Sequence, residues 1–337
     1  MKKNIVTAFC SIALLTGCQQ AEEIENMGEK LPMSVEAGIV KALGSRYVAV
    51  GNDPNNLSFM SGNAIGVAVK GGKFVKWTLN SSSWTPEGDG AYWPDKEESY
   101  TFNAFYPYAN VPETGNITMP NLSDGQDGTM AWIAEHDFLA TTKTESYDEN
   151  AGKVSFTDDY AFKHVSSLLQ ITLKGEGDLL GSTITSIELK GSDIVSSSTY
   201  KFSDSEGSIG DVTVKTDEKG DEISISPKHT MNADGYVIYF IVNAGTVELD
   251  KVSLTIKYMS GETPFTATLS KLGKSGEKFG IGKYYKYGIK VSEGVLTVSG
   301  NEISTWGDGG EIDDIIINGI QDSNSNNEGG NNEGDGE

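Results

Sequence analysis

The sequence is poor in cysteine and histidine, and each shortage excludes a class of site. Only two of the 337 residues are cysteine. Both lie near the N-terminus, so the rest of the chain can form neither an internal disulfide nor a thiolate metal cluster. The three histidines are far apart and lack metal-ligand spacing, which favours ordinary hydrogen-bonded roles. We therefore expect no catalytic residue, no metal and no cofactor. The cysteines are Cys10 and Cys18, and the histidines are His136, His164 and His229.

Basic residues are also few. The chain has 26 lysine and arginine residues against 48 acidic residues, and its formal net charge is -22. Phosphate contacts need clustered lysine and arginine, and no such cluster occurs. Nucleic acid and anionic lipid surfaces are therefore not expected partners. Arg46 is the single arginine of the sequence.

The longest apolar run lies near the N-terminus, in residues 5–15 behind two lysines. It is too short to span a bilayer as a helix and suits the central region of a signal peptide. Residues 15–18, Leu-Thr-Gly-Cys, indicate lipoprotein cleavage, which makes Cys18 the first mature residue and the lipid attachment site. An ordinary secretory signal with an unmodified Cys18 thiol is the alternative. The acidic residues that follow favour display on the outer surface.

Strand patterns recur about every 8 to 15 residues along the chain. In residues 65–69 and 75–79, apolar side chains alternate with polar or small ones around a Gly-Gly turn, which predicts a hairpin. Residues 252–258 alternate in the same way. The unbroken apolar run 236–242 predicts a central strand covered on both faces. No pattern predicts a helix of three turns, so the expected fold class is all-β with little helix.

The length of the chain suits two cores, and the alternating strands suit stacked sheets. We expect two tandem antiparallel β-sandwich domains, residues 34–160 and 161–320. Residues 1–17 are the expected signal peptide and residues 18–33 a tether. Residues 321–337 carry no apolar side chain and are expected to form a disordered acidic tail.

Two segments of the expected N-terminal domain bear on function. Residues 34–40 are predicted to form its first strand, followed by a loop that contains Lys41 and Arg46. Residues 109–152 are predicted to be a long loop with one short strand near residues 138–141.

Several stretches occur in an order that resembles a known family. Together with the lipoprotein signal they resemble the fimbrillin-like lipoproteins, the two-domain pilins of type V fimbriae in Gram-negative gut and oral anaerobes. The resemblance covers roughly residues 35–320. The stretches are 58–67 (SFMSGNAIGV), 92–94 (YWP), 100–108 (YTFNAFYPY), 162–169 (FKHVSSLL), 282–287 (GKYYKY) and 303–306 (ISTW).

The resemblance implies two transthyretin-like β-sandwiches and assembly at the cell surface. An arginine- or lysine-specific protease is expected to cut the loop after the first strand, which removes the lipid and the strand together. Arg46 stands where such a cut would fall, with Lys41 as the lesser candidate. The exposed backbone edge would then accept a strand from the next subunit, and head-to-tail pairing of this kind grows a filament. Residues 313–320 are a candidate donor strand.

The partners implied are other fimbrial subunits, the outer membrane through the lipid, and a host or bacterial surface ligand. The expected location is the outer membrane or fimbrium, on the extracellular face. Stalk subunits are expected to carry the donor strand close to the C-terminus, whereas an acidic tail follows it here, so tip, accessory and uncut anchor or adhesin roles stay open.

Two other functions also stay open. One is a membrane-anchored lipoprotein that binds surface glycans through exposed tryptophans, among them Trp77, Trp84, Trp93 and Trp132. The other is a glycoside hydrolase that uses a pair of carboxylates.

Overall fold

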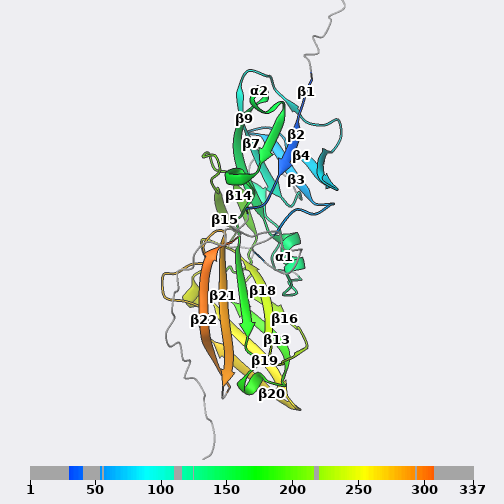
Figure 1. Ribbon diagram of the computed structural model, residues 1–337. Coiled ribbons are helices and arrows are strands. Elements are labelled where there is room, and N and C mark those ends of the chain that lie inside the picture. The colour runs from blue at the N-terminus through cyan, green and yellow to red at the C-terminus, as the bar shows by residue number, and fades with distance from the viewer. Residues whose placement is uncertain are drawn as a thin grey trace, which may run out of the picture. The chain divides into compact units, whose positions relative to one another are not determined.

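The computed structural model describes residues 30–40, 54, 57–109, 116–123, 125–215, 220–292 and 294–306. These residues are mostly strands in several sheets, with few helical residues (Figure 1). The all-β fold class is therefore confirmed. The predictions for Cys18, Arg46, residues 313–320 and the acidic tail fall outside the described residues.

A six-stranded antiparallel sheet contains the predicted hairpin. Its strands, in spatial order, are β11 (Lys163–His164), β9 (Leu139–Ser146), β7 (Ser99–Tyr106), β3 (Ala64–Val69), β4 (Val75–Asn80) and β5 (Ser83–Pro86). Ile65 pairs with Trp77 and Val67 with Val75, which confirms the hairpin.

Two short strand pairs cover one face of this sheet. The parallel pair joins β2 (Ser34–Ala37) to β10 (Lys153–Phe156), and the antiparallel pair joins β1 (Leu31–Pro32) to β6 (Tyr92–Trp93). Buried side chains from both layers form the first core, which includes Val35, Trp77, Phe102, Val154 and Phe156. Since Leu31 is buried in this core, the predicted tether over residues 18–33 is wrong for its last residues.

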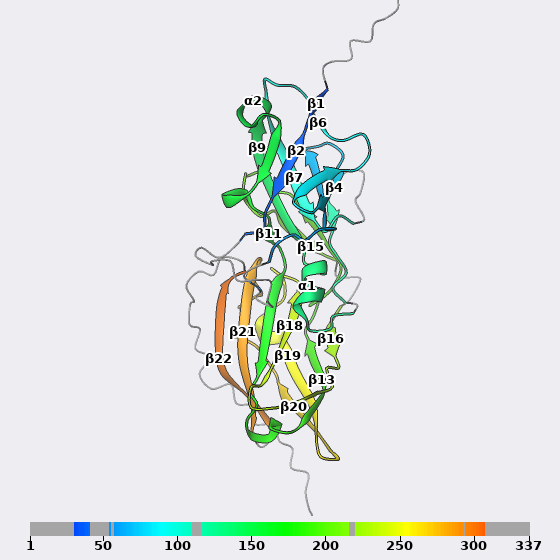
Figure 2. The same cartoon turned by 45° about the vertical axis from the view of Figure 1, so that its right-hand side comes forward.

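A three-stranded sheet lies on the opposite face. Its strands are β15 (Asp211–Val214), β14 (Ser198–Lys201) and β8 (Ile117–Thr118). Phe105 and Ala140, from β7 and β9, pack here with Phe138 and Tyr200. Figure 1 shows β14 close to β7 and β9, and the turned view of Figure 2 shows β15 below β7. The β8–β14 ladder joins residues on either side of the predicted domain boundary near residue 160, and that boundary stays a prediction.

Two further sheets enclose a second core that includes Ile187, Phe240, Leu254, Ile256 and Tyr287. One sheet has the order β18 (Tyr236–Val242), β12 (Ser167–Leu173), β21 (Lys283–Ser292) and β22 (Val295–Thr305). The other has the order β16 (Glu222–Ile225), β13 (Thr183–Lys190), β19 (Ser253–Ser260) and β20 (Thr263–Leu269), with β17 (His229–Thr230) also paired to β13. Alternate residues of β19 are buried, as its sequence predicts.

The prediction that residues 236–242 form a central strand is wrong, because β18 lies at the end of its sheet. Val237 is 41% exposed. The side chain of Gln126 occupies part of the open edge: its Nε2 donates to the Ile241 carbonyl over 2.9 Å, and its Oε1 accepts from the Ile241 amide over 3.1 Å. An apolar run thus reflects burial of side chains and not a strand neighbour on each side.

Helices are short. They are α1 (Met130–His136), α2 (Tyr147–Asn150) and the one-turn helices η2 (Asp158–Tyr160), η3 (Gly177–Leu179) and η4 (Leu249–Lys251). Thr129 caps α1 by accepting from the Trp132 amide over 3.3 Å. The prediction of a loop over residues 109–152 is therefore wrong in part, because α1 and the full length of β9 lie there; β9 is rich in threonine and lacks a clear apolar alternation. No helix among the described residues is long and apolar enough to cross a bilayer.

Candidate functional site

The first strands of the described chain, residues 31–40, form what we call the N-terminal segment. Its odd-numbered side chains face the first core: Leu31, Val35 and Ile39 are 7%, 9% and 8% exposed. Met33 and Ala37 are half-buried against the same core. The even-numbered positions are mostly exposed. The segment therefore presents one apolar edge inward, as a strand on the surface of a sandwich does.

Backbone hydrogen bonds hold the N-terminal segment to β10 and to the chain beyond it, and its first residues pair with β6, next to which the Met33 amide donates to the Ala91 carbonyl over 2.9 Å. In the described residues, β2 and β10 are each other's only strand neighbours. The bonds continue past β2, where Ile39 forms a parallel bridge with Phe162. The amide-to-carbonyl contacts at the two ends are Ser34 to Gly152 at 3.0 Å, Gly38 to Phe156 at 2.9 Å, Val40 to Phe162 at 2.9 Å and Phe162 to Gly38 at 2.9 Å.

The surface beneath the N-terminal segment is apolar. Val154, Phe156 and Phe162 are fully buried, and the two phenylalanine rings meet edge to face with centroids 5.8 Å apart. If the segment left, this apolar surface and the β10 backbone groups would both become exposed to solvent. An edge of this kind pairs readily with another extended chain.

The outward face of the segment carries an ion pair. Lys153 Nζ lies 2.8 Å from Glu36 Oε2. The hydrogen bond from Lys153 lowers the pKa of Glu36, and the same bond raises the pKa of Lys153. Both side chains are about half exposed, so the pair adds little to stability.

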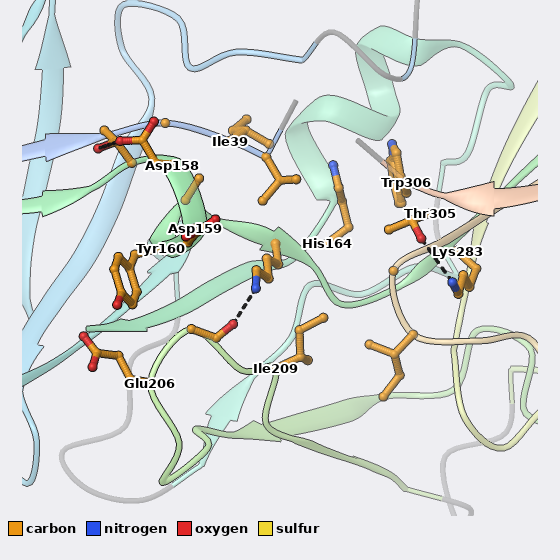
Figure 3. Close-up of a pocket in the computed structure, with 18 residues that line it drawn as sticks. Ile39, Asp158, Asp159, Tyr160, His164, Glu206, Ile209, Lys283, Thr305 and Trp306 are labelled. Carbon is orange, nitrogen blue, oxygen red and sulfur yellow. Dashed lines mark hydrogen bonds between the residues drawn. The ribbon is translucent and has the colours of Figure 1, made fainter. Parts of the chain in front are cut away.

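An open pocket of about 1040 Å³ lies where the segment ends. Figure 3 shows Ile39 among its lining residues, with Asp158 and Tyr160 on one side and His164 beside Trp306. Its basic side chains already have partners in the lining: Lys163 Nζ donates to the Gly207 carbonyl and Lys283 Nζ to Thr305 Oγ1, over 3.1 Å in the second case.

His164 forms a buried pair with Asp137, with 2.5 Å between His164 Nδ1 and Asp137 Oδ2. Burial raises the pKa of Asp137, outweighing the opposite effect of His164. The imidazole stacks on the Trp306 ring with centroids 3.9 Å apart, and Trp306 Nε1 donates to the Pro54 carbonyl over 3.1 Å. No group of three potential metal-binding side chains occurs in the described ranges. The pair thus fixes Trp306 at the end of β22.

A model of the fimbrillin-like family matches residues 51–306. The chain belongs to the fimbrillin-like family. The resemblance found in the sequence motifs is therefore confirmed. Family membership supports the role of a fimbrial or adhesin subunit, located at the cell surface and associated with other fimbrial subunits.

Solved structures similar to this fimbrillin-like chain include two from Bacteroides species. They are candidate cell adhesion proteins from Bacteroides uniformis, with 20% identity and a TM-score of 0.55, and from Bacteroides ovatus, with 16% identity and a TM-score of 0.56. Each comparison covers 82% of this chain and 98% of the other. At such identities the likeness concerns the fold alone. A comparison with curated proteins gives no match.

The residues that sequence analysis selected for this fimbrillin-like chain, Cys18 and Arg46, lie outside the described residues, as does Lys41. The predicted first strand is present as β2, and Ile39 continues it through its bridge. Sequence analysis missed the Asp137–His164 pair, since the two residues are 27 positions apart and no spacing rule connects them.

The other histidines lie apart from His164, each beside an aromatic ring. His136 stacks on Trp132 and His229 on Tyr236. All five tryptophans are described, and none is exposed: Trp77, Trp93 and Trp306 are buried, whereas Trp84 and Trp132 are half-buried. Exposed tryptophan platforms for glycan binding thus have no support here.

Proposed function

We propose that this fimbrillin-like chain is exported as a lipoprotein and assembles by strand exchange. Cleavage at Arg46 separates the N-terminal segment from the body of the protein, and a strand from another subunit takes its place. Cys18 carries the lipid that holds the chain at the outer membrane before cleavage. Lys41 is the second candidate for the cut.

The observation that carries the proposal is the position of the N-terminal segment. It is continuous in sequence with the expected cleavage loop. Its main-chain partners are β6, β10 and Phe162, and none of them belongs to the six-stranded sheet. Its inward side chains belong to the first core. A segment with these properties can leave without unpairing the six-stranded sheet.

The packing also indicates how exchange proceeds. Burial of the Leu31, Val35 and Ile39 side chains contributes about 1.5 to 3 kcal/mol each, or about 5 to 9 kcal/mol together. A segment held this strongly stays bound after the backbone is cut. Release therefore needs a competing strand that fills the same positions, so assembly is driven by exchange and not by prior dissociation.

An arginine-specific protease tests the proposal, because Arg46 is the single arginine and gives a single cut. The cut protein should form head-to-tail oligomers, measured by size-exclusion chromatography with light scattering. Arg46→Ala protein should stay monomeric under the same treatment, and Lys41→Ala protein should behave as the wild type. Oligomers of equal size from Arg46→Ala protein would rule out cleavage at this site.

The membrane anchor is tested separately by mass spectrometry of the N-terminus on intact cells. An acylated Cys18 is expected before cleavage and Tyr47 after it. Cys18→Ser should abolish the acylated form. A lipid-free N-terminus elsewhere in the uncut chain would exclude the lipoprotein part of the proposal and leave strand exchange untouched.

A further inference from the structure

Strand β10 has an unusual position in the fold, because its ladder is made with β2 alone among the described strands. In a strand, successive residues direct their backbone groups to opposite edges. Gly152 and Phe156 use the edge that faces the N-terminal segment, where their carbonyls accept from Ser34 and Gly38. Ser155 therefore faces the other edge.

Two charged side chains of β9 occupy that other edge. The Ser155 amide donates to Glu145 Oε2 over 3.1 Å, and the Ser155 carbonyl accepts from Lys143 Nζ over 2.9 Å. Lys143 and Glu145 also form an ion pair with each other. Their side chains are 16% and 4% exposed, so the hydrogen bonds are largely shielded from water.

Neighbouring groups fix the position of this pair. Lys143 and Glu145 are two residues apart on β9 and so lie on the same face of the sheet, toward β10. Lys143 Nζ also lies 4.9 Å from the centroid of the Tyr160 ring. The hydrogen bonds, the ion pair and the ring contact are all to residues of β9, β10 and η2. The N-terminal segment adds only the attraction between the Glu36 and Lys143 charges, the last among the causes that lower the pKa of Glu36. The contacts within β9, β10 and η2 can therefore persist when that segment leaves.

We propose that Lys143 and Glu145 are positioning residues that hold β10 in place while its other edge is empty, and that they direct the incoming strand to the edge that β2 leaves. The inference rests on the proposed strand exchange and names the residues that prepare its acceptor. Without them β10 would be a single strand with unpaired backbone groups on both edges. With them, both Ser155 backbone groups on one edge stay paired while the other edge is open.

The partner that fits the open edge is an extended segment of a second fimbrial subunit, with apolar side chains at alternate positions. The odd-numbered positions of the N-terminal segment define the spacing that this partner must match. Gln126 caps the edge of β18 in the same manner, by bonding both backbone groups of Ile241. The fold thus uses side chains to pair backbone groups at the edges of β10 and β18, and the edge under the N-terminal segment is closed by a strand that can leave.

Peptide binding to the cut protein tests the inference. The probe is a fluorescent synthetic peptide with the sequence of residues 30–40. It is added to protein that has been cut at Arg46, separated from its own segment in urea and refolded, and binding is followed by fluorescence anisotropy. Lys143→Met and Glu145→Met should each weaken peptide binding about tenfold or more, because each leaves a Ser155 backbone group without its charged partner. Lys143→Arg, which keeps a charged donor, should restore most of the binding.

Lys257→Met is the matched control. Lys257 forms an ion pair with Glu188, on the strands β19 and β13, so its loss should leave peptide binding within about twofold of wild type. Hydrogen exchange of the β10 amides gives a second measurement. Lys143→Met should change exchange little in the uncut protein, where the segment is bound, and should speed it in the cut protein mainly after the segment or peptide is removed. Glu145→Gln, which keeps an acceptor oxygen, is the substitute where Glu145→Met does not fold.

The outcomes separate the two ideas. Wild-type cut protein that never binds the peptide would overturn the proposed strand exchange, and the role of Lys143 and Glu145 with it. Binding by wild type that is matched by both methionine variants would overturn the positioning role alone. A loss of binding in Lys257→Met as large as in Lys143→Met would also overturn it, since the effect would then be one of general stability.

Discussion

Replacement of Val35 by alanine isolates the contribution of core packing to retention of the N-terminal segment. Val35 is 9% exposed and packs in the first core. Loss of two carbon atoms removes about 1.6 kcal/mol of burial, and the cavity left behind raises the cost to about 2 kcal/mol. Since a tenfold change in binding corresponds to about 1.4 kcal/mol, the same substitution should weaken binding of the segment to the cut protein about 30-fold.

Two assays measure this cost in different states of the protein. Urea denaturation of uncut Val35→Ala protein, followed by tryptophan fluorescence, should give a free energy of unfolding lower by about 2 kcal/mol. A peptide of residues 30–40 with the same substitution should bind cut wild-type protein about 30-fold more weakly than the unsubstituted peptide.

Val237→Ala is the matched control, because Val237 is also a strand valine but is 41% exposed. It should change the free energy of unfolding by about 0.5 kcal/mol or less. If the substituted peptide bound as tightly as the original while the uncut protein lost the full amount of about 2 kcal/mol, packing of Val35 in the first core would not be what retains the segment.

Three further predictions concern charge and aromatic packing. A Glu36→Gln substitution in the peptide should weaken its binding less than about threefold, and the difference should vanish in about 1 M salt, since the pair with Lys153 is exposed. Because the pKa of Glu36 is lowered in the folded state, the contribution of this pair to stability is present above pH 4.5 and is lost as the pH falls through the folded-state pKa. Burial raises the pKa of Asp137 above 3.8, so the stability gained from its protonation is fully present below pH 3.8 and is lost as the pH rises through the raised pKa. Asp137→Asn should therefore flatten this part of the plot of urea midpoint against pH. Parallel plots for wild type and Asp137→Asn would show that the pKa of Asp137 is not raised by burial. Trp306→Ala should lower the free energy of unfolding by about 3 to 5 kcal/mol, whereas Trp84→Ala, at a half-buried position, should cost less in the same assay.

The local pattern of the sequence was sufficient for much of the sheet structure. Alternation in residues 65–79 predicted the β3–β4 hairpin, and alternation in residues 252–258 predicted the buried face of β19. Side-chain alternation depends on the geometry of one strand, so neighbouring residues carry the information. The same reasoning predicted only the first residues of β9, because its buried Thr141 and Thr142 do not differ from surface residues in composition.

Neighbouring strands could not be predicted in the same way. The parallel pairings of β2 with β10 and of β12 with β21 depend on which distant segment lies alongside, and an apolar pattern does not specify it. The edge position of β18 was missed for this reason. Side-chain caps are still less predictable, because Gln126 bonds Ile241 at a separation of 115 residues.

The sequence by itself determined the all-β class, the fimbrillin-like family and the existence of a first strand ahead of a lone arginine, because these follow from composition, short motifs and local periodicity. Only the tertiary structure decided that this strand is held along β10 and that Lys143 and Glu145 close the opposite edge of the same strand. The physical reason is that a backbone edge has no sequence signature: whether it is open, paired or capped depends on what folds against it.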